Sequence, residues 1–447
     1  MTERQPPVFD PAAPHQQRPK LRAIRGFPAQ HGEQTLLGLA DARQISDEVV
    51  FTSPAAQVIL QHMDGSRDVD GILAAVSQGL RRSDLEMLIA QLDQAGLLEG
   101  PTFQEMLMKV RREYDSMPYL PPAGTANFAD ALAAQELGEN ATKERLAEVG
   151  ATKLREQMDK WMDEALKDAP DPAYTALPKA IIAPHLDYWR GWQNYSHAYG
   201  RLRVADRPDR VIILGTNHFG FGTGVVACDK GFQSPLGLCE VDQAFIDTLN
   251  RHLSAEQSRL LFEHRFDHER EHSVELQIPW IQRVFGESDG GAFPKVLGIL
   301  VHDPAPNNGE SYDGKGLGIL PFIDAMKKTV AEMPGRTLIV SSADLSHVGF
   351  SFGDRVSIVA NEPESVAFRN KVVQHDREMI ELIRQGKGEE LVASMAWQQN
   401  PTRWCSVGNL VATMKIVGGG DVRLLNYAIA TDPQGAAAVS SMAGAIV

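Results

Sequence analysis

Histidines that follow apolar runs are the residues of this chain best suited to chemistry. His185 follows AIIAP, His218 follows IILGTN and His347 follows IVSSADLS. Each run is apolar enough for a strand that is buried on both faces. In sheets of such strands, binding sites gather just past the carboxyl ends. Because imidazole binds transition metals and is the commonest general base near neutral pH, the three histidines indicate a metal site or an acid–base site.

A fourth histidine and several anionic side chains could complete that site. His272 begins a predicted helix after the charged loop EHRFDHEREHS. Two imidazoles and one anionic ligand would leave open coordination positions, as in non-heme Fe(II) sites. The candidates for the anionic ligand are Asp187, Asp344, Glu275 and Cys405. Cys405 precedes a helical run, which favours binding as thiolate, although a buried inert thiol is the competing interpretation. Asp187 in a strand-end turn would more often cap the following helix.

Strands and helices alternate in the part of the chain that holds these residues. The apolar runs predict strands over 180–185, 210–218, 295–302 and 336–347. Helical patterns predict helices over 191–202, 241–253, 272–285 and 320–333. This order predicts an α/β fold with a central sheet that helices cover on both faces.

A chain of 447 residues is too long for one ordinary core, so we expect several domains. Two short strands and three helices after residue 20 predict a small winged-helix-like α+β domain. The predicted division is a disordered lead-in over 1–20, the winged-helix-like domain over 21–105, a linker and helical connector over 106–176, and the α/β domain over 177–447.

The charge balance and the cysteines restrict the partners and the compartment. Asp and Glu total 58 against 44 Lys and Arg, a formal net charge of −14. Such a balance argues against binding nucleic acid or an anionic membrane. The three cysteines form no CxxC pair, which favours a reducing compartment, and we expect the cytoplasm. No apolar run is long enough for a membrane helix, and no signal-peptide pattern opens the chain.

Six segments in order resemble the Memo family, whose bacterial and archaeal members are called AmmeMemoRadiSam system protein B. They are APHLDY, ILGTNH, EHSVELQIP, SSADLSH, the segment around Cys405, and LLNYA, and they span residues 177–447. The resemblance implies a fold like that of class III extradiol dioxygenases. It also implies an iron or copper site of two histidines and one cysteine, which fall here on His185, His218 and Cys405.

Neighbouring positions of the family fall on His272, Asp344 and His347. The resemblance implies that His347 is a base or substrate contact near the metal, that Asp344 orients it, and that His272 is a further acid–base group. The sequence departs from the family pattern at Leu186 and Asp187, at Phe219, and at SVGN after the cysteine. These departures put the shape of the pocket in doubt but keep the ligands.

The first domain resembles a PqqD-like peptide-recognition module over residues 22–100. The resemblance rests on TSPAAQVILQHMDGSRDVDGILAAV and LIAQLDQAGLLEG. It implies that an extended peptide binds along a strand edge. A DNA-binding winged helix is the rival, but its basic stripe is missing. The predicted helices instead carry the acidic residues Asp68, Asp70, Asp84, Glu86 and Asp93.

Three functions compete on this evidence. The first is a redox or O2-dependent protein with one Fe(II) or copper ion and an unknown substrate. The second is a metal- or peptide-binding adaptor without catalysis. The third is a zinc hydrolase with the same three ligands. The system name implies a radical SAM enzyme as partner and a peptide or protein as substrate, while the oligomeric state stays open.

Overall fold

The computed structural model describes residues 7–32, 34–76, 79–138 and 140–447. It divides into two compact units, Met1–Met117 and Pro118–Val447. The first boundary thus lies beyond the predicted limit of residue 105, because helix α5 (Pro101–Ser116) belongs to the first unit. None of the helices in the described ranges is long and apolar enough to cross a membrane.

The first unit is the small α+β domain that the sequence predicts. Its antiparallel sheet has the order β1-β2-β3, with β1 (Ile24–His31), β2 (Gln34–Asp41) and β3 (Val49–Thr52). Strands β1 and β2 are the predicted pair, and β3 was not predicted. The three predicted helices are α2 (Gln57–Leu60), α3 (Val69–Ala75) and α4 (Arg82–Gln94). Ser53 and Asp68 cap the first turns as their side chains predict. Leu39, Ile72 and Ile89 lie in the core.

The described part of the predicted lead-in is folded, which corrects the expectation of disorder over 1–20. Helix α1 (Pro14–Gln17) presents Gln16, whose Nε2 donates to Asp93 of α4 at 2.7 Å. Lys20 forms a β-bridge with Asp64. Because a buried carboxylate such as Asp93 needs donors, the polar segment before residue 21 has a reason to fold back. Residues 1–6 lie outside the described ranges.

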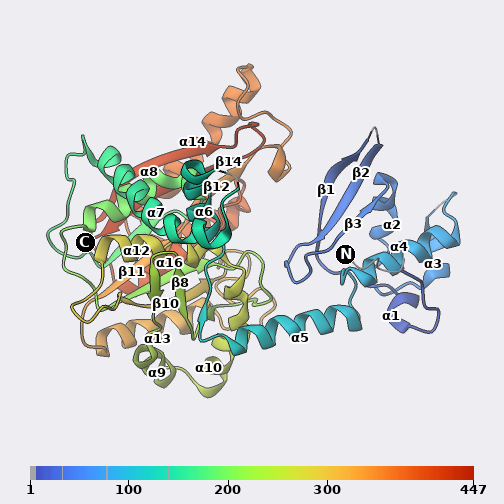
Figure 1. The fold of residues 1–447 in the computed structure, drawn as a ribbon, viewed down its shortest axis with the longest axis horizontal. Helices are drawn as coiled ribbons and strands as arrows, with labels where there is room; N and C mark the ends of the chain where they lie inside the picture. The colour runs from blue at the N-terminus through green and yellow to red at the C-terminus, as the bar shows by residue number, and fades with distance from the viewer. Residues whose placement is uncertain (1–6, 33, 77–78, 139) are drawn as a thin grey trace. The chain divides into compact units, whose positions relative to one another are not determined.

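The second unit is built on a mixed sheet of eight strands (Figure 1). Its order is β12-β14-β5-β11-β6-β10-β7, with β13 paired to β14. The strands are β5 (Ala180–Ala183), β6 (Arg210–Thr216), β7 (Val226–Ala227), β10 (Lys295–Val301), β11 (Thr337–Ser342), β12 (Asp344–Val348), β13 (Val422–Thr431) and β14 (Ala438–Ile446). The central strands β5, β11, β6 and β10 are parallel, so their carboxyl ends meet at one edge. A second sheet contains β4 (Tyr119–Leu120), β8 (Gly231–Ser234) and β9 (Gly237–Cys239).

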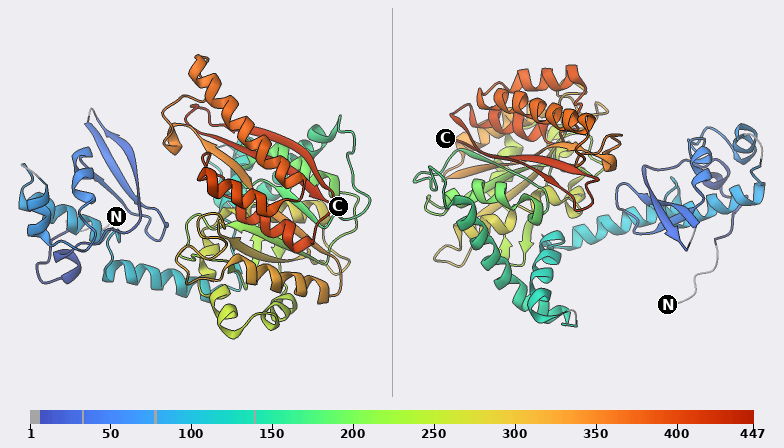
Figure 2. Two further views of the ribbon diagram at one scale, coloured as in Figure 1. Left: turned by 180° about the vertical axis from the view of Figure 1, so that it is seen from behind. Right: turned by 90° about the horizontal axis from the view of Figure 1, so that it is seen from above.

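Helices cover both faces of the main sheet, as predicted (Figure 2). The bounds are α6 (Gly124–Leu137), α7 (Lys143–Leu166), α8 (Tyr188–Tyr199), α9 (Gln243–Arg251), α10 (Ala255–Phe262), α11 (His272–Glu275), α12 (Ile278–Phe285), α13 (Ile319–Glu332), α14 (Pro363–Arg384), α15 (Gly388–Gln398) and α16 (Val407–Val417). Helix α16 packs on β5, β6, β10 and β11, and α13 packs on α16. Helix α8 packs on β5, β13 and β14.

Two predicted elements are each divided in the structure. The strand predicted over 336–347 separates at Ala343 into β11, which pairs with β5 and β6, and β12, which pairs with β14. The helix predicted over 272–285 is interrupted before Pro279, which occupies the first turn of α12. Proline lacks the N–H that a continuous helix needs, so the chain restarts there.

Candidate metal centre

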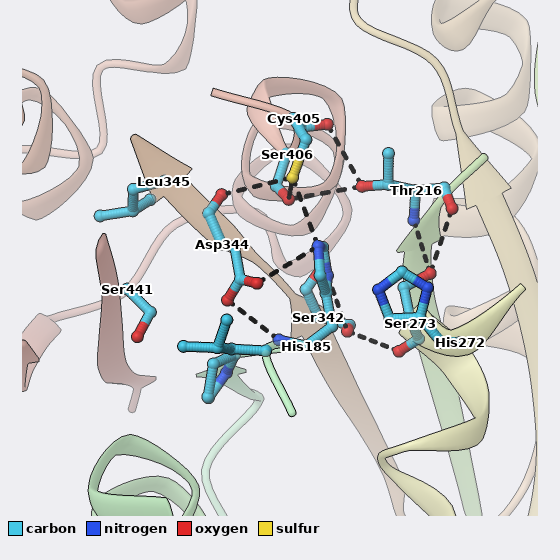
Figure 3. A network of polar contacts seen from close by, with 12 residues as sticks. His185, Thr216, His272, Ser273, Ser342, Asp344, Leu345, Cys405, Ser406 and Ser441 are labelled. Carbon is cyan, nitrogen blue, oxygen red and sulfur yellow. Dashed lines mark hydrogen bonds and ion pairs between the residues drawn. The ribbon is translucent and has the colours of Figure 1, made fainter. Parts of the chain in front are cut away.

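Three segments that are distant in sequence meet at the carboxyl edge of the parallel strands. His185 lies two residues beyond β5, His218 lies two residues beyond β6, and Cys405 lies two residues before α16. Their ligand atoms lie within 4.8 Å of one another. The Cys405 sulfur is 3.3 Å from His185 Nε2, and Figure 3 shows the two side chains directed toward each other. The three predicted metal ligands therefore form one cluster.

His185 is fixed by the strand beside it. Its Nδ1 lies 3.1 Å from the carbonyl oxygen of Ser342, the last residue of β11. That contact places the proton on Nδ1 and leaves Nε2 free to bind a metal. Burial lowers the pKa of His185 well below its ordinary value, and the neighbouring histidines lower it further. The ring is therefore neutral, which is the form that coordinates metals.

His218 is held by a glutamate that the sequence prediction missed. Glu271 accepts from the His218 backbone N–H at 2.8 Å, and its Oε1 lies 3.0 Å from His218 Nδ1. Burial would lower the pKa of His218, but the charges and hydrogen bonds of Glu271 and Cys405 outweigh it and raise that pKa well above its ordinary value. A carboxylate behind a metal-binding imidazole orients the ring and increases its basicity.

Glu271 and His272 form a second group with His218 whose ligand atoms are equally close. Glu271, however, also accepts from the Ser273 backbone N–H at 2.9 Å. Its oxygens thus lie against several protein donors, which places Glu271 to support the site from behind. His272 Nδ1 lies 3.2 Å from Glu271 Oε1, and its ring centroid is 4.9 Å from that of His218. His272 thus lies beside the proposed ligands.

His347 and Asp344 lie at the same edge but do not contact each other as predicted. His347 Nδ1 faces the carbonyl oxygens of Leu345 and Arg403 at 2.9 and 3.1 Å. Asp344 instead accepts from the His185 backbone N–H at 3.1 Å. The expected orientation of His347 by Asp344 is therefore corrected: backbone carbonyls orient His347, and Asp344 supports His185. Burial raises the pKa of Asp344 to about 7 and lowers that of His347 to about 4.

A cavity of about 520 Å³ opens beside these side chains. The polar part of its lining includes His185, His218, His272, Asp344 and His347. Its apolar walls include Phe128, Leu186, Leu276, Phe352 and Val439. The volume is within the range of small-molecule sites, and the mixture of apolar walls with a few convergent polar groups is typical of them.

Comparison with known proteins identifies the larger unit. The model of the family described as Memo-like protein matches residues 148–446. The chain belongs to the Memo family. A MEMO1 family protein of Methanopyrus kandleri is 28% identical over 259 residues, which cover 57% of this chain and 77% of that protein. One from Thermotoga petrophila is 33% identical over 185 residues, which cover 40% and 58%. One from Desulfurococcus amylolyticus is 27% identical over 271 residues, which cover 60% and 82%.

Two other carboxylates that were candidate ligands have structural roles in this Memo domain. Glu275 accepts from the backbone N–H groups of Ala123 and Thr125 at 2.8 and 2.9 Å, so it caps α6. Asp187 accepts from the Arg190 backbone N–H and caps α8, as its place in a strand-end turn predicts. Neither belongs to the ligand clusters found in the described ranges.

The donor set of the Memo domain fits a transition metal ion. Two ligand atoms on one ion lie roughly 3–4.5 Å apart when each bond is roughly 2.0–2.3 Å long, which agrees with the separation of these three donors. Two imidazoles and a thiolate suit Fe(II), copper and zinc rather than Mg²⁺ or Ca²⁺.

Proposed function

We propose that the Memo domain binds one iron or copper ion through His185, His218 and Cys405 and serves redox or O2-dependent chemistry on a substrate in the adjoining cavity. The observation that supports this proposal is the convergence of the three donor atoms. The hydrogen-bonded Nδ1 atoms of both histidines add to it, because these bonds orient the rings and leave Nε2 as the nitrogen that would bind the ion.

Iron or copper would supply Lewis acidity and one-electron redox chemistry at the cavity. The protein's own part is to position the substrate and move protons. Neutral His347 has its Nδ1 committed to carbonyls, so its Nε2 accepts a proton from a substrate group. His272, whose Nδ1 lies 3.2 Å from Glu271 Oε1, is a second candidate proton acceptor. Phe128 and Phe352 exclude water from the walls.

Metal content tests the proposal directly. The full-length protein would be purified without oxygen and analysed for metals, beside His185→Ala and Cys405→Ala. We expect about one equivalent of iron or copper in the native protein, and its loss from both variants. Zinc in the native protein, together with esterase or amidase turnover, would favour the hydrolase instead. Absence of any metal after reconstitution would reject a metal site and leave a binding protein.

For the first unit, we propose recognition of a peptide of the partner or substrate. Strand β3 is an edge strand, since among the described residues β2 is the one strand that pairs with it. A cavity of about 230 Å³ lies beside it, and its lining includes Val49, Phe51, Gln91 and Gln94. An added peptide strand would use the open edge for main-chain hydrogen bonds. A radical SAM enzyme of the same system is the proposed partner. The three cysteines form no disulfide in the described ranges, which suits the reducing cytoplasm.

Removal of residues 1–117 separates the two proposals. We expect the remaining protein to retain its metal equivalent and to lose binding to the radical SAM enzyme in a pull-down assay. Unchanged binding would place the partner surface on the Memo domain.

A further inference from the structure

The described lining of the cavity beside the ligand cluster contains one arginine or lysine, Arg190 of α8. Most of the other lining side chains that face it are apolar or are the histidines of the site. A cation in a cavity with apolar walls attracts an anion more strongly than the same cation in open water, because solvent screens it less. Arg190 is therefore placed to favour anionic ligands over neutral ones in this cavity.

The protein holds Arg190 in place through one of its side-chain nitrogen atoms and, among the residues that the structure describes, leaves the other two without a partner. Its Nε donates to Asp187 Oδ2 at 2.5 Å, and Asp187 is itself held as the cap of α8. Within the described ranges, its terminal Nη1 and Nη2 atoms have no hydrogen-bond partner. The Arg190 side chain is 32% exposed, so the protein does not enclose it completely. A guanidinium held at Nε presents the rest of its planar fork to a carboxylate with little loss of entropy.

Other groups that could bind an anion at the cavity are already occupied. Gly124 lies in the lining at the start of α6, but Glu275 accepts from the N–H groups of Ala123, Gly124 and Thr125. Those three N–H groups are therefore not available to a ligand. Asp187 offsets part of the charge of Arg190, so long-range attraction of anions to the cavity is weak. An anion gains most when it forms direct hydrogen bonds with the Nη atoms of Arg190.

We propose that the cavity takes an organic acid with an apolar body, whose carboxylate pairs with the Nη atoms of Arg190 while the body lies against the apolar wall. That this acid is a substrate rests on the proposed function, which places the reaction at this cavity. The volume of about 520 Å³ accommodates a small acid or the last residue of a peptide. Both sources share the chemistry of a carboxylate next to an apolar group.

Binding of matched acids and amides tests the proposal. Phenylacetate and phenylacetamide would be titrated into the metal-loaded full-length protein by ligand-observed NMR. The peptide source would be represented by acetyl-Gly-Gly-Phe and its C-terminal amide. We expect at least one acid to bind about tenfold or more tightly than its amide. Arg190→Gln should abolish this preference, and Arg190→Lys should reduce it because lysine lacks the planar fork.

Arg336→Gln is the matched control, because Arg336 also makes one ion pair, with Asp206, and lies outside the cavity lining. It should leave the preference unchanged. A preference for phenylacetate alone identifies a small acid, and a preference for the peptide acid identifies a C-terminus. Equal binding of acids and amides, or a preference that survives in Arg190→Gln, would overturn the inference. Normal metal content in the same samples would show that the metal proposal stands when this one fails.

Discussion

The four histidines of the cavity share one arrangement: each has its Nδ1 against an acceptor of the protein. The acceptors are the Ser342 carbonyl for His185, Glu271 for His218 and His272, and the carbonyls of Leu345 and Arg403 for His347. In His185 and His347, whose pKa values are lowered, this arrangement selects the neutral tautomer with a free Nε2. The distance of each ring to the Cys405 sulfur then separates the proposed metal ligands from the proposed proton acceptors. His185 and His218 are the two histidines that form a cluster with this sulfur.

Glu271→Gln should weaken metal binding about tenfold to a hundredfold, the usual effect of removing a carboxylate behind a ligand histidine. Glutamine can still accept one hydrogen bond but no longer increases the basicity of His218. Competition with a chromogenic chelator would measure the affinity. Glu256→Gln is the control, because Glu256 is exposed and pairs with Arg259. Equal affinity of Glu271→Gln and the native protein would show that Glu271 has no part in the site.

His347→Gln should leave the metal content near one equivalent, whereas His185→Gln should remove the metal. The reason is that His347 is outside the ligand cluster, although it lines the same cavity. Elemental analysis of the two variants, purified in parallel, decides the matter. Loss of metal from His347→Gln with normal folding would make His347 a ligand.

The sequence was sufficient for the ligand candidates but not for the residues that support them. His185 and His218 could be predicted because each follows an apolar run, and Cys405 because its segment resembles a family motif. Glu271 could not be selected, since the loop EHRFDHEREHS offers several carboxylates and only the folded chain brings one of them behind His218. The contact of Asp344 with His185 likewise depends on the place where β11 ends and β12 begins.

At the scale of elements, a buried carboxylate of α14 joins the segments around the site. Asp376 Oδ1 accepts from Ser346 Oγ at 2.5 Å and from Trp404 Nε1 at 2.8 Å. Its Oδ2 accepts from Tyr427 at 2.7 Å and from Ser440 at 2.6 Å. Ser346 precedes His347, and Trp404 precedes Cys405. The network therefore fixes β12 and the cysteine segment relative to β13 and β14.

Asp376→Asn should destabilise the second unit by about 1–3 kcal/mol, because the amide nitrogen cannot accept and leaves buried donors unpaired. Urea denaturation would measure the free energy of unfolding. Glu389→Gln is the control, since Glu389 is exposed and pairs only with Lys415. We also expect weaker metal binding, because the Cys405 segment loses its anchor. A free energy of unfolding equal to that of the control would contradict the structural role of Asp376.

The sequence was sufficient to predict the central strands of the sheet. It was less informative about the hairpin and about the burial of α14. The runs at 180–185, 210–218 and 295–302 are continuous apolar stretches, and all three are strands of the sheet. The hairpin of β13 and β14 was not predicted, although it supplies one side of the sheet. Asp376 lies in the polar helical sequence QHDREM, which in isolation is typical of a solvent-exposed helix face. Its burial follows only from the packing of α14 on β12 and β13.

At the scale of the whole molecule, the burial of several histidines makes the second unit sensitive to acid. Burial lowers the pKa of His268 to about 4, and it also lowers the pKa of His302 and His375. Between pH 6.5 and pH 4 the unfolded chain therefore binds more protons than the folded chain, and stability falls as the pH falls. His218 acts in the opposite sense: its raised pKa gives a contribution that is present below pH 6.5 and is lost at higher pH.

His268 provides the test of this acid sensitivity because it is buried and is not a member of the ligand clusters in the described ranges. Its Nε2 lies 3.2 Å from the Val226 carbonyl oxygen, and a glutamine at this position can keep such a bond without titrating. On going from pH 6.5 to pH 5, the native protein should lose about 1.5 kcal/mol more stability than His268→Gln. Each pKa unit corresponds to about 1.4 kcal/mol, and the unfolded histidine is already half protonated at about pH 6.5. All six tryptophans lie beyond residue 117, so their fluorescence during urea denaturation reports this unit alone.

His252→Gln is the control for this measurement. It changes a partly exposed histidine that is paired with Glu332, and it should keep the native pH dependence. The same loss of stability in His268→Gln as in the native protein would mean that the buried ring is not the group that takes up the proton.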